Sequence, residues 1–435
     1  MASIYIETYG CQMNEYDSEL VKTLLVDNRH NLTPEIGDAD VILLNTCAVR
    51  ENAYNKIYAR VGDLKYYRES RKTRVGILGC MAQNVQDNLL KNRNIDFAVG
   101  PDSYRQLPGL IGEAMDGGED EAITVLSKEE TYSDVQPQRE DGVNGWIAVM
   151  RGCDNFCTFC VVPYTRGRER SRTIDSVVEE ATKAVSLGKK QITLLGQNVN
   201  SYSSNDASFA DLMEAVAQVK GLERVRFTSP HPMDFPEELL RVISRHDNLC
   251  KQIHLPLQAG NDDVLKRMNR GYTQDTFLEV AGRIRSILPT AHISTDIIVG
   301  FPGESPEQFE DTKKVMDQVR FDSAFIFKYS PREGTLAKRR FPDDVEASEK
   351  TRRIVELNEL QKEHTLESLK KHLGKQMTVL VEKESTPLSA EQCQGRIDQG
   401  VTVVLPQDGS IKAGDEVSVK ISGHTSHVLL AEPAP

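Results

Sequence analysis

The chain has 435 residues, a formal net charge of −12 and 39% hydrophobic residues. This length is enough for two or three domains, each with its own core, and no apolar run approaches the ~20 residues that span a bilayer. Because nothing at the N-terminus resembles a signal peptide, we expect a cytoplasmic protein. Its eight cysteines are then reduced thiols or metal ligands rather than disulfides.

The first 117 residues alternate short apolar runs with helical patterns. Such alternation predicts a doubly wound α/β domain with a parallel sheet. One helical pattern runs from Ser18 to Asp27, with Leu20, Leu24 and Leu25 on one face. The predicted strands are 4–10, 39–46, 73–79 and 95–100.

Three cysteines follow three of these strands. Cys11, Cys47 and Cys80 each come directly after a predicted strand, about one βα repeat apart. Open α/β sheets build their sites at the carboxyl ends of their strands, so we expect the three thiols to meet in one crevice. The alternative is that each is a small buried side chain in the core.

An acidic stretch at 116–143 supplies −7 of the net charge, with nine acidic residues against Lys128 and Arg139. Since it also holds Gly117, Gly118 and Pro137, we interpret 118–142 as a solvated linker. A negative chain argues against a nucleic-acid partner, but charge concentrated in a linker does not exclude one.

The central part of the chain opens with a dense cysteine motif. Cys153, Cys157 and Cys160 follow the predicted strand 146–150 with the spacing C-x3-C-x2-C. Four cysteines normally close a 4Fe-4S cluster, so three thiolates leave one iron open to another ligand. The alternative is structural zinc, which needs a fourth nearby ligand; the nearest downstream histidine is His231.

A longer βα series occupies 143–373. Helical patterns at 174–187 and 306–319 separate some of its strands, and a long helix is predicted at 345–373. Six βα units do not fill a closed eight-stranded barrel, so we expect an open, partial (βα)6 barrel. Its predicted strands are 146–150, 191–195, 223–228, 252–257, 293–299 and 323–329.

The C-terminal residues 374–435 change pattern. Predicted strands at 376–383, 400–406, 415–423 and 427–432 alternate with period two around Gly and Pro turns. This pattern indicates a small antiparallel β-barrel. Its eight acidic residues exceed its five basic ones, but such barrels bind RNA through shape and stacking as well as charge.

Together these features resemble the radical S-adenosylmethionine (SAM) methylthiotransferase family, whose C-terminal barrel is an RNA-binding TRAM domain. The segments TYGCQMN (8–14), NTCAVRENA (45–53) and GCMAQ (79–83) resemble the branch that acts on tRNA. The branch that modifies an aspartate of a small-subunit ribosomal protein usually has Pro-Lys-Asn after the first cysteine. The branch for threonylcarbamoyl-adenosine tRNA usually has a lysine there. A non-enzymatic Fe-S or zinc RNA-binding protein is the alternative from another class.

The resemblance implies methylthiolation at C2 of an N6-isopentenyladenosine beside the tRNA anticodon. It implies two 4Fe-4S clusters, one on Cys153, Cys157 and Cys160 and an auxiliary sulfur carrier on the three N-terminal cysteines. Two SAM molecules serve as methyl donor and as source of a 5′-deoxyadenosyl radical. The implied partners are the anticodon stem-loop and an electron donor such as flavodoxin or ferredoxin, with no membrane and a monomeric chain. Cys250 and Cys393 are expected to be unligated.

The resemblance also suggests further site residues, for each of which packing or capping is the alternative. Candidate SAM-pocket residues are Phe159, Gln197, Asn198, Ser229, Gln258, Arg267, Asp296, Val299 and Phe301. Candidate substrate-binding residues are Gln12, Asn14, Arg166, Arg168 and Arg332. A basic run adds Arg170 and Arg172, and Lys338, Arg339 and Arg340 lie further on; all are candidates for phosphate contacts, with an ordinary solvated surface as the alternative.

Overall fold

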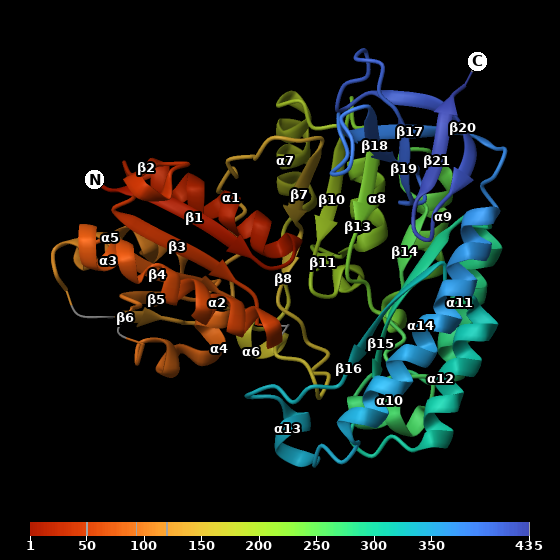
Figure 1. Ribbon diagram of the computed structural model, residues 1–435, viewed down its shortest axis with the longest axis horizontal. Helices are drawn as coiled ribbons and strands as arrows, with labels where there is room; N and C mark the ends of the chain where they lie inside the picture. Colours follow the sequence, from red (N-terminus) through yellow and green to blue (C-terminus); the bar gives the residue numbers. More distant parts are fainter. Residues whose placement is uncertain (49–50, 93, 119–120, 435) are drawn as a thin grey trace.

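The computed structural model describes residues 1–48, 51–92, 94–118 and 121–434 (Figure 1). It has an N-terminal α/β domain, a central open barrel and a C-terminal closed β-barrel. Val49 and Arg50 of the second cysteine motif, and Glu119 and Asp120 of the acidic stretch, lie outside the described residues. None of the described helices has the length and apolar character needed to cross a membrane.

The N-terminal sheet is entirely parallel, in the order β2-β1-β3-β4-β5-β6. Separate apolar cores cover its two faces, which confirms the doubly wound prediction. The strands are β1 (Ser3–Tyr9), β2 (Asn31–Leu32), β3 (Val41–Thr46), β4 (Arg74–Gly79), β5 (Phe97–Val99) and β6 (Glu121–Ile123). The helices are α1 (Gln12–Asp27), α2 (Glu51–Asp63), α3 (Lys65–Arg71), α4 (Cys80–Leu89) and α5 (Leu107–Met115).

The stretch 121–142 is not a solvated linker, so that interpretation was wrong. Strand β6 pairs with β5 at the edge of the sheet, and Tyr132 and Val135 are buried. The Arg139 side chain is buried between Glu19 and Glu180. Charge composition suggested solvent exposure, but a few apolar anchors and paired charges fix this segment against both neighbouring domains.

The central domain is an open arc of parallel strands. One sheet has the order β13-β10-β7 and the other β14-β15-β16, and a parallel bridge between Val225 and Leu249 joins them. This confirms the partial barrel. The strands are β7 (Asn144–Ala148), β10 (Gln191–Leu195), β13 (Arg224–Phe227), β14 (Gln252–His254), β15 (His292–Val299) and β16 (Ser323–Lys328).

The longer helices cover the convex side of this arc (Figure 1). They are α7 (Ile174–Ser186), α8 (Phe209–Ala217), α9 (Glu237–Arg245), α11 (Gln274–Ile287), α12 (Pro306–Val319) and α14 (Ala347–Lys370). The short elements are α6 (Val162–Arg166), α10 (Asp262–Met268), α13 (Leu336–Arg340), β8 (Met150–Arg151), β9 (Arg170–Ser171), β11 (Ser203–Ser204) and β12 (Ala207–Ser208).

The C-terminal barrel closes in the order β17-β18-β19-β21-β20. All pairs are antiparallel except β19 with β21. Its strands are β17 (Gln376–Lys383), β18 (Gln392–Arg396), β19 (Thr402–Pro406), β20 (Glu416–His424) and β21 (Leu429–Pro433). Strand β18 was not predicted, because its sequence QCQGR has only Cys393 as an apolar side chain to mark a buried face.

Candidate active site

The N-terminal cysteines lie at the carboxyl ends of β1, β3 and β4, which are neighbours in the sheet. Cys11 precedes α1, Cys47 follows β3 directly, and Cys80 is the first residue of α4. The backbone N–H of Cys47 donates to the Tyr9 carbonyl at 3.0 Å. The strand order also places the topological switch of the sheet between β1 and β3, where doubly wound folds bind their ligands.

Two buried asparagines fix this sheet edge. Asn14 donates through Nδ2 to Asn45 Oδ1 and to the Thr46 carbonyl, both at 3.2 Å. Gly79 has φ of +89°, and a Cβ there would lie 2.7 Å from the Thr46 carbonyl oxygen. The turn into α4 therefore requires glycine. Asn14, a candidate substrate residue, is fully buried, and its hydrogen bonds hold the start of α1 against the end of β3. Gln12, the other candidate in this segment, is exposed.

The thiols of this edge have different acidities. A hydrogen bond with Cys47 lowers the pKa of Cys11 to about 6, with help from the charge of Arg166 and against the partial desolvation of the thiol. Burial raises the pKa of Cys80, although Arg166 opposes that shift. The Arg166 Nε donates to Cys80 Sγ at 3.2 Å. A cationic donor on a cysteine sulfur stabilises its thiolate.

The central cysteine loop is tightly held. The Cys153 N–H donates to the Gly167 carbonyl at 3.1 Å, and a Cβ on Gly152 would lie 2.0 Å from the Arg168 carbonyl oxygen. Thr158 ties the loop to α10 by hydrogen bonds to the carbonyls of Met268 and Arg267. Phe156 has φ of +48°, an uncommon conformation for a residue with a side chain.

Burial raises the pKa of Cys153 and of Cys160 to about 12. Arg270, at the end of α10, donates through Nη1 to Cys157 Sγ at 3.2 Å. The sequence reasoning missed Arg270, since nothing in its neighbourhood marks it as a partner of a cysteine in another loop. Such thiols become thiolates when they bind a metal, with release of protons.

The donor sets consist of cysteines alone, which suits an iron–sulfur cluster. Among the described residues, no group of three or more His, Cys, Asp or Glu side chains could hold a metal ion. A zinc site gathers its sulfurs about one ion at ~2.3 Å. A 4Fe-4S cluster binds each thiolate through a different iron, so its sulfurs stand further apart. Two all-cysteine sets, each with an arginine donating to one sulfur, suit such a cluster.

The segment that carries the central cysteines lies beside the N-terminal cysteine site. Cys80 packs against Val161, the residue after Cys160, and against Ala48. Helices α4 and α6 lie side by side at the lower centre of Figure 1. Since α6 ends at Arg166, the same short segment carries the last cysteine of one site and the arginine donor of the other.

Several candidate SAM residues lie at the carboxyl ends of the next strands. Asn198 Oδ1, His231 Nε2 and Gln258 Oε1 are buried and have no hydrogen-bond partner among the described residues. Ser229 and Gln258 have φ of +59° and +66°, a strain that often accompanies binding sites. Gln197 Oε1 accepts from the Gly152 N–H at 2.6 Å. His231 was not among the candidate residues.

The remaining candidates have partners of their own. Arg267 donates to the Gly303 carbonyl at 3.2 Å and to Gln308, and Asp296 Oδ2 lies 3.3 Å from His254 Nε2. Val299 and Phe301 are fully buried and belong to the central core. Phe159 is partly buried against the central core.

The basic run does not form a phosphate surface, so that expectation was wrong for three of its four arginines. Arg166, Arg170 and Arg172 are buried. Their guanidinium groups pair with buried carboxylates of Asp17, Asp102 and Glu180, in that order. The segment 166–172 runs along the boundary between the N-terminal and central domains. Its arginines therefore neutralise carboxylates that are buried there. Arg168 alone is exposed, and it pairs with Asp154.

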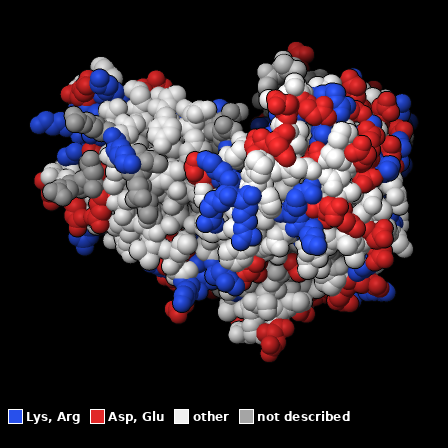
Figure 2. All heavy atoms as spheres, turned by 90° about the horizontal axis from the view of Figure 1, so that it is seen from below, with Lys and Arg blue, Asp and Glu red and all other residues white. Residues whose placement is uncertain are grey.

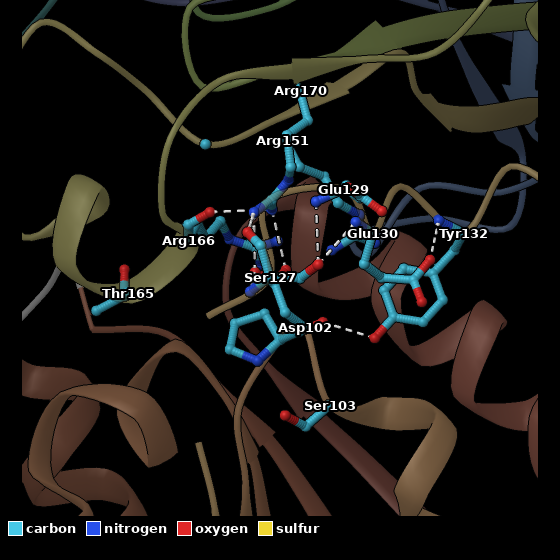
Figure 3. A network of polar contacts seen from close by, with 12 residues as sticks. Asp102, Ser103, Ser127, Glu129, Glu130, Tyr132, Arg151, Thr165, Arg166 and Arg170 are labelled. Carbon is cyan, nitrogen blue, oxygen red and sulfur yellow. Dashed lines mark hydrogen bonds and ion pairs between the residues drawn. The ribbon is translucent and has the colours of Figure 1, made fainter. Parts of the chain in front are cut away.

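Figure 3 shows the part of this network around Asp102, Arg151, Arg166 and Arg170. Both oxygens of Asp102 accept from Arg170 at 3.0 Å. The guanidinium of Arg151 stands 4.7 Å from the ring centroid of Tyr132 and donates to Asp17 at 2.7 Å. Burial alone would raise the pKa of Asp17, but Arg151 and Arg166 outweigh it and hold that pKa below its usual value.

Exposed basic residues lie instead at the mouth of the central barrel, where the carboxyl ends of its strands open to solvent. Helix α13, at the lower end of the molecule in Figure 1, carries Lys338, Arg339 and Arg340, all exposed. Seen from below, Lys and Arg side chains gather across the middle of the surface (Figure 2). Arg332 precedes this helix and is partly buried.

Comparison with known proteins defines the class. Residues 147–316 match the radical SAM superfamily, residues 3–100 match the uncharacterized protein family UPF0004, and residues 370–434 match the TRAM domain. The chain is therefore a three-part radical SAM protein, and this class implies SAM and a 4Fe-4S cluster. Among solved structures, the radical SAM methyltransferase TsrM from Kitasatospora setae shares the fold, with a TM-score of 0.61, 14% identity and coverage of 77% of this chain and 74% of that one.

Curated relatives are similar over nearly the whole length. The tRNA-2-methylthio-N(6)-dimethylallyladenosine synthase of Porphyromonas gingivalis is 44% identical, with 99% of this chain and 94% of the relative covered. The synthase of the same name from Chlorobium phaeobacteroides is 44% identical, with 99% and 97% covered. This chain belongs to the tRNA-2-methylthio-N(6)-dimethylallyladenosine synthase family.

Proposed function

We propose that this chain is a methylthiotransferase that acts at C2 of N6-dimethylallyladenosine (N6-isopentenyladenosine) beside the tRNA anticodon. The observation that carries the proposal is the pair of three-cysteine sets, which the contact of Arg166 with Cys80 and the apolar cluster of Ala48, Cys80 and Val161 bring near each other. One set follows a barrel strand and the other follows three neighbouring sheet strands. A reaction that combines a radical source with a sulfur carrier needs two such sites close together.

In this proposal Cys153, Cys157 and Cys160 hold one 4Fe-4S cluster and Cys11, Cys47 and Cys80 hold a second. The clusters and SAM supply the radical and group-transfer chemistry when bound, because acid–base catalysis offers no easy route to an unactivated aromatic C–H bond. Three thiolates per cluster leave one iron position open for SAM or sulfur. The chain itself positions and shields these groups: the six cysteines are buried or partly buried except Cys11.

The SAM site that we propose lies at the carboxyl ends of the barrel strands. Gln197, Asn198, Ser229 and Gln258 line it from successive loops, with Asp296 and Arg267 beyond them. The buried, unpartnered oxygens of Asn198 and Gln258 suit the ammonium and hydroxyl groups of SAM, since a buried acceptor without a donor is costly. Phe159 and the backbone at 299–301 would pack on the adenine.

We assign tRNA contacts to α13 and to the C-terminal barrel. Lys338, Arg339 and Arg340 supply phosphate contacts beside the mouth. The C-terminal barrel docks at the other end of the central strands, where Arg226 donates to the carbonyls of Ile397 and Asp398. The electron donor that we propose is flavodoxin or ferredoxin, and the chain would act as a monomer.

The test is a nucleoside assay with the anaerobically reconstituted protein. Full-length chain, SAM, reductant and tRNA bearing N6-dimethylallyladenosine should give the 2-methylthio nucleoside in a digest analysed by mass spectrometry. Changing Cys11, Cys47 or Cys80 to Ala should abolish product, whereas Cys250→Ala, a buried cysteine outside both sets, should keep it. Product only on threonylcarbamoyl-adenosine tRNA, or on a ribosomal-protein peptide, would contradict the assignment.

A further inference from the structure

Strand β16 is the last strand of the open barrel, and it carries two large aromatic side chains that no part of the described chain covers fully. Phe325 is 57% exposed and Phe327 is 43% exposed. Alternate residues of this strand face the other way. Ile326 packs against the central core, and Lys328 Nζ donates to Thr351 of α14 at 2.8 Å. Phe325 and Phe327 therefore lie on the concave face of the barrel, away from its helices.

The neighbouring strands continue this face. Asp296 pairs in register with Phe325, and Ile298 pairs with Phe327. The ring of His254 stands 6.4 Å from that of Phe325. His254 is fixed by Asp296 at 3.3 Å and by Ser294 Oγ at 3.0 Å. The concave face thus combines two exposed aromatic rings with one acidic edge.

The two ends of this face differ. At the amino ends of the strands the C-terminal barrel closes it, because a Cβ on Gly400 would lie 2.2 Å from Gln252 Oε1. At the carboxyl ends, the chain after β16 runs to Gly334, beside Asn84 of α4, the helix that begins with Cys80. A molecule that lies on the two phenylalanines therefore reaches toward the cysteine sites.

We infer that Phe325 and Phe327 bind the dimethylallyl group of the substrate adenosine. This inference rests on the proposed function. The group is a branched, five-carbon, apolar chain, and residues two apart on a strand are separated by about 7 Å, which suits a chain of that size. Two apolar rings offer no hydrogen-bond partner to the carboxylate of a threonylcarbamoyl group, so placing that charge on them is costly. The same face would therefore separate the two tRNA substrates.

The experiment compares two anticodon stem-loop RNAs that differ only in the dimethylallyl group. Their affinities for the reconstituted protein are measured by fluorescence anisotropy for wild type, Phe325→Ala and Phe327→Ala. We expect wild type to bind the modified RNA more tightly than the unmodified one. Each alanine variant should lose about ten-fold of that ratio of affinities, the usual scale for removing an apolar contact of this size. Val355→Ala, at an exposed apolar position on α14, is the control and should keep the wild-type ratio.

Iron content and circular dichroism establish that each variant is folded, and Phe325→Ser and Phe327→Ser, with the same expected loss of preference, replace any alanine variant that is not. Phe325→Leu and Phe327→Leu are further controls. These leucine variants keep an apolar surface and should retain most of the preference. An unchanged ratio of the two affinities in the alanine variants would overturn the inference. This includes the case in which both RNAs lose affinity by the same factor. Failure of the proposed function is separately visible, because wild type would then form no 2-methylthio product from the modified RNA.

Discussion

At the scale of single residues, Arg166 links the two cysteine sites. It follows Cys160 on α6, donates to Cys80 at 3.2 Å and pairs with the buried Asp17 at 2.7 Å. The sequence predicted the six cysteines, because spacing and position after strands mark them. It could not reveal Arg166 or Arg270 as sulfur partners, because those contacts depend on how distant segments pack.

Arg166→Gln tests this link. It leaves the buried Asp17 with one ion-pair partner fewer and should lower the free energy of unfolding by about 3 kcal/mol, the usual cost of breaking a buried pair. Denaturant unfolding of the apoprotein, followed by circular dichroism, measures the change. Arg168→Gln, at the exposed arginine two residues on, should change stability by less than about 1 kcal/mol. Equal effects of the two variants would argue against a buried anchor.

Gly152→Ala tests the cysteine loop. Its Cβ would lie 2.0 Å from the Arg168 carbonyl oxygen, so the loop that begins at Cys153 must shift and should lose iron from that site. Gly188→Ala is a matched control, since Gly188 also has positive φ, of +90°, but open space around it. Iron analysis should show a loss of about half the iron for Gly152→Ala only. If Gly152→Ala bound as much iron as wild type, the loop would tolerate a Cβ at this position, and the prediction would be wrong.

At the scale of elements, most of the strands that apolar alternation and βα spacing predicted lie within two residues of their observed bounds. Helix α12 begins and ends as predicted. The failures have physical causes. The acidic stretch was judged by its charge, yet Tyr132 and Val135 bury it. Strand β18 is short and polar, so barrel closure by its neighbours, rather than its own pattern, defines it.

Docking of the C-terminal barrel gives a prediction at this scale. Arg226 donates to Gln191 and Gln252 within the central domain and to the carbonyls of Ile397 and Asp398 in the C-terminal barrel. Arg226→Ala therefore removes two hydrogen bonds across the domain boundary. Limited proteolysis should cut faster between α14 and β17 in this variant, with iron content unchanged. Arg241→Ala breaks only an exposed helix pair with Glu237 and should be cut at the wild-type rate. Identical rates would mean that other contacts hold the barrel.

At the scale of the whole molecule, the net charge of −12 hides a local basic surface. Helix α13 presents its three basic residues beside the barrel mouth, and Lys and Arg gather on the face seen in Figure 2. The buried arginines have the opposite role, since they join the N-terminal and central domains. The sequence showed both groups of basic residues, but only burial separates the two roles.

Changing Lys338, Arg339 and Arg340 together to Gln should weaken tRNA binding and make it less dependent on salt. Each lost phosphate contact should reduce the slope of log affinity against log salt by about 0.7 to 0.9, the values for single strands and for duplex DNA. Filter binding over a salt series measures the slope. Lys314→Gln, an exposed lysine on α12, should leave the slope unchanged. An unchanged slope in the triple variant would place the phosphates elsewhere.

The central claim is that the chain holds two clusters, one for each cysteine set. The most direct measurement is iron per chain after anaerobic reconstitution. Wild type should contain about eight irons, and Cys153→Ala/Cys157→Ala/Cys160→Ala should contain about four. The triple variant should also lose SAM cleavage while keeping its N-terminal cluster. About four irons in wild type, or zinc in place of iron, would contradict the two-cluster account.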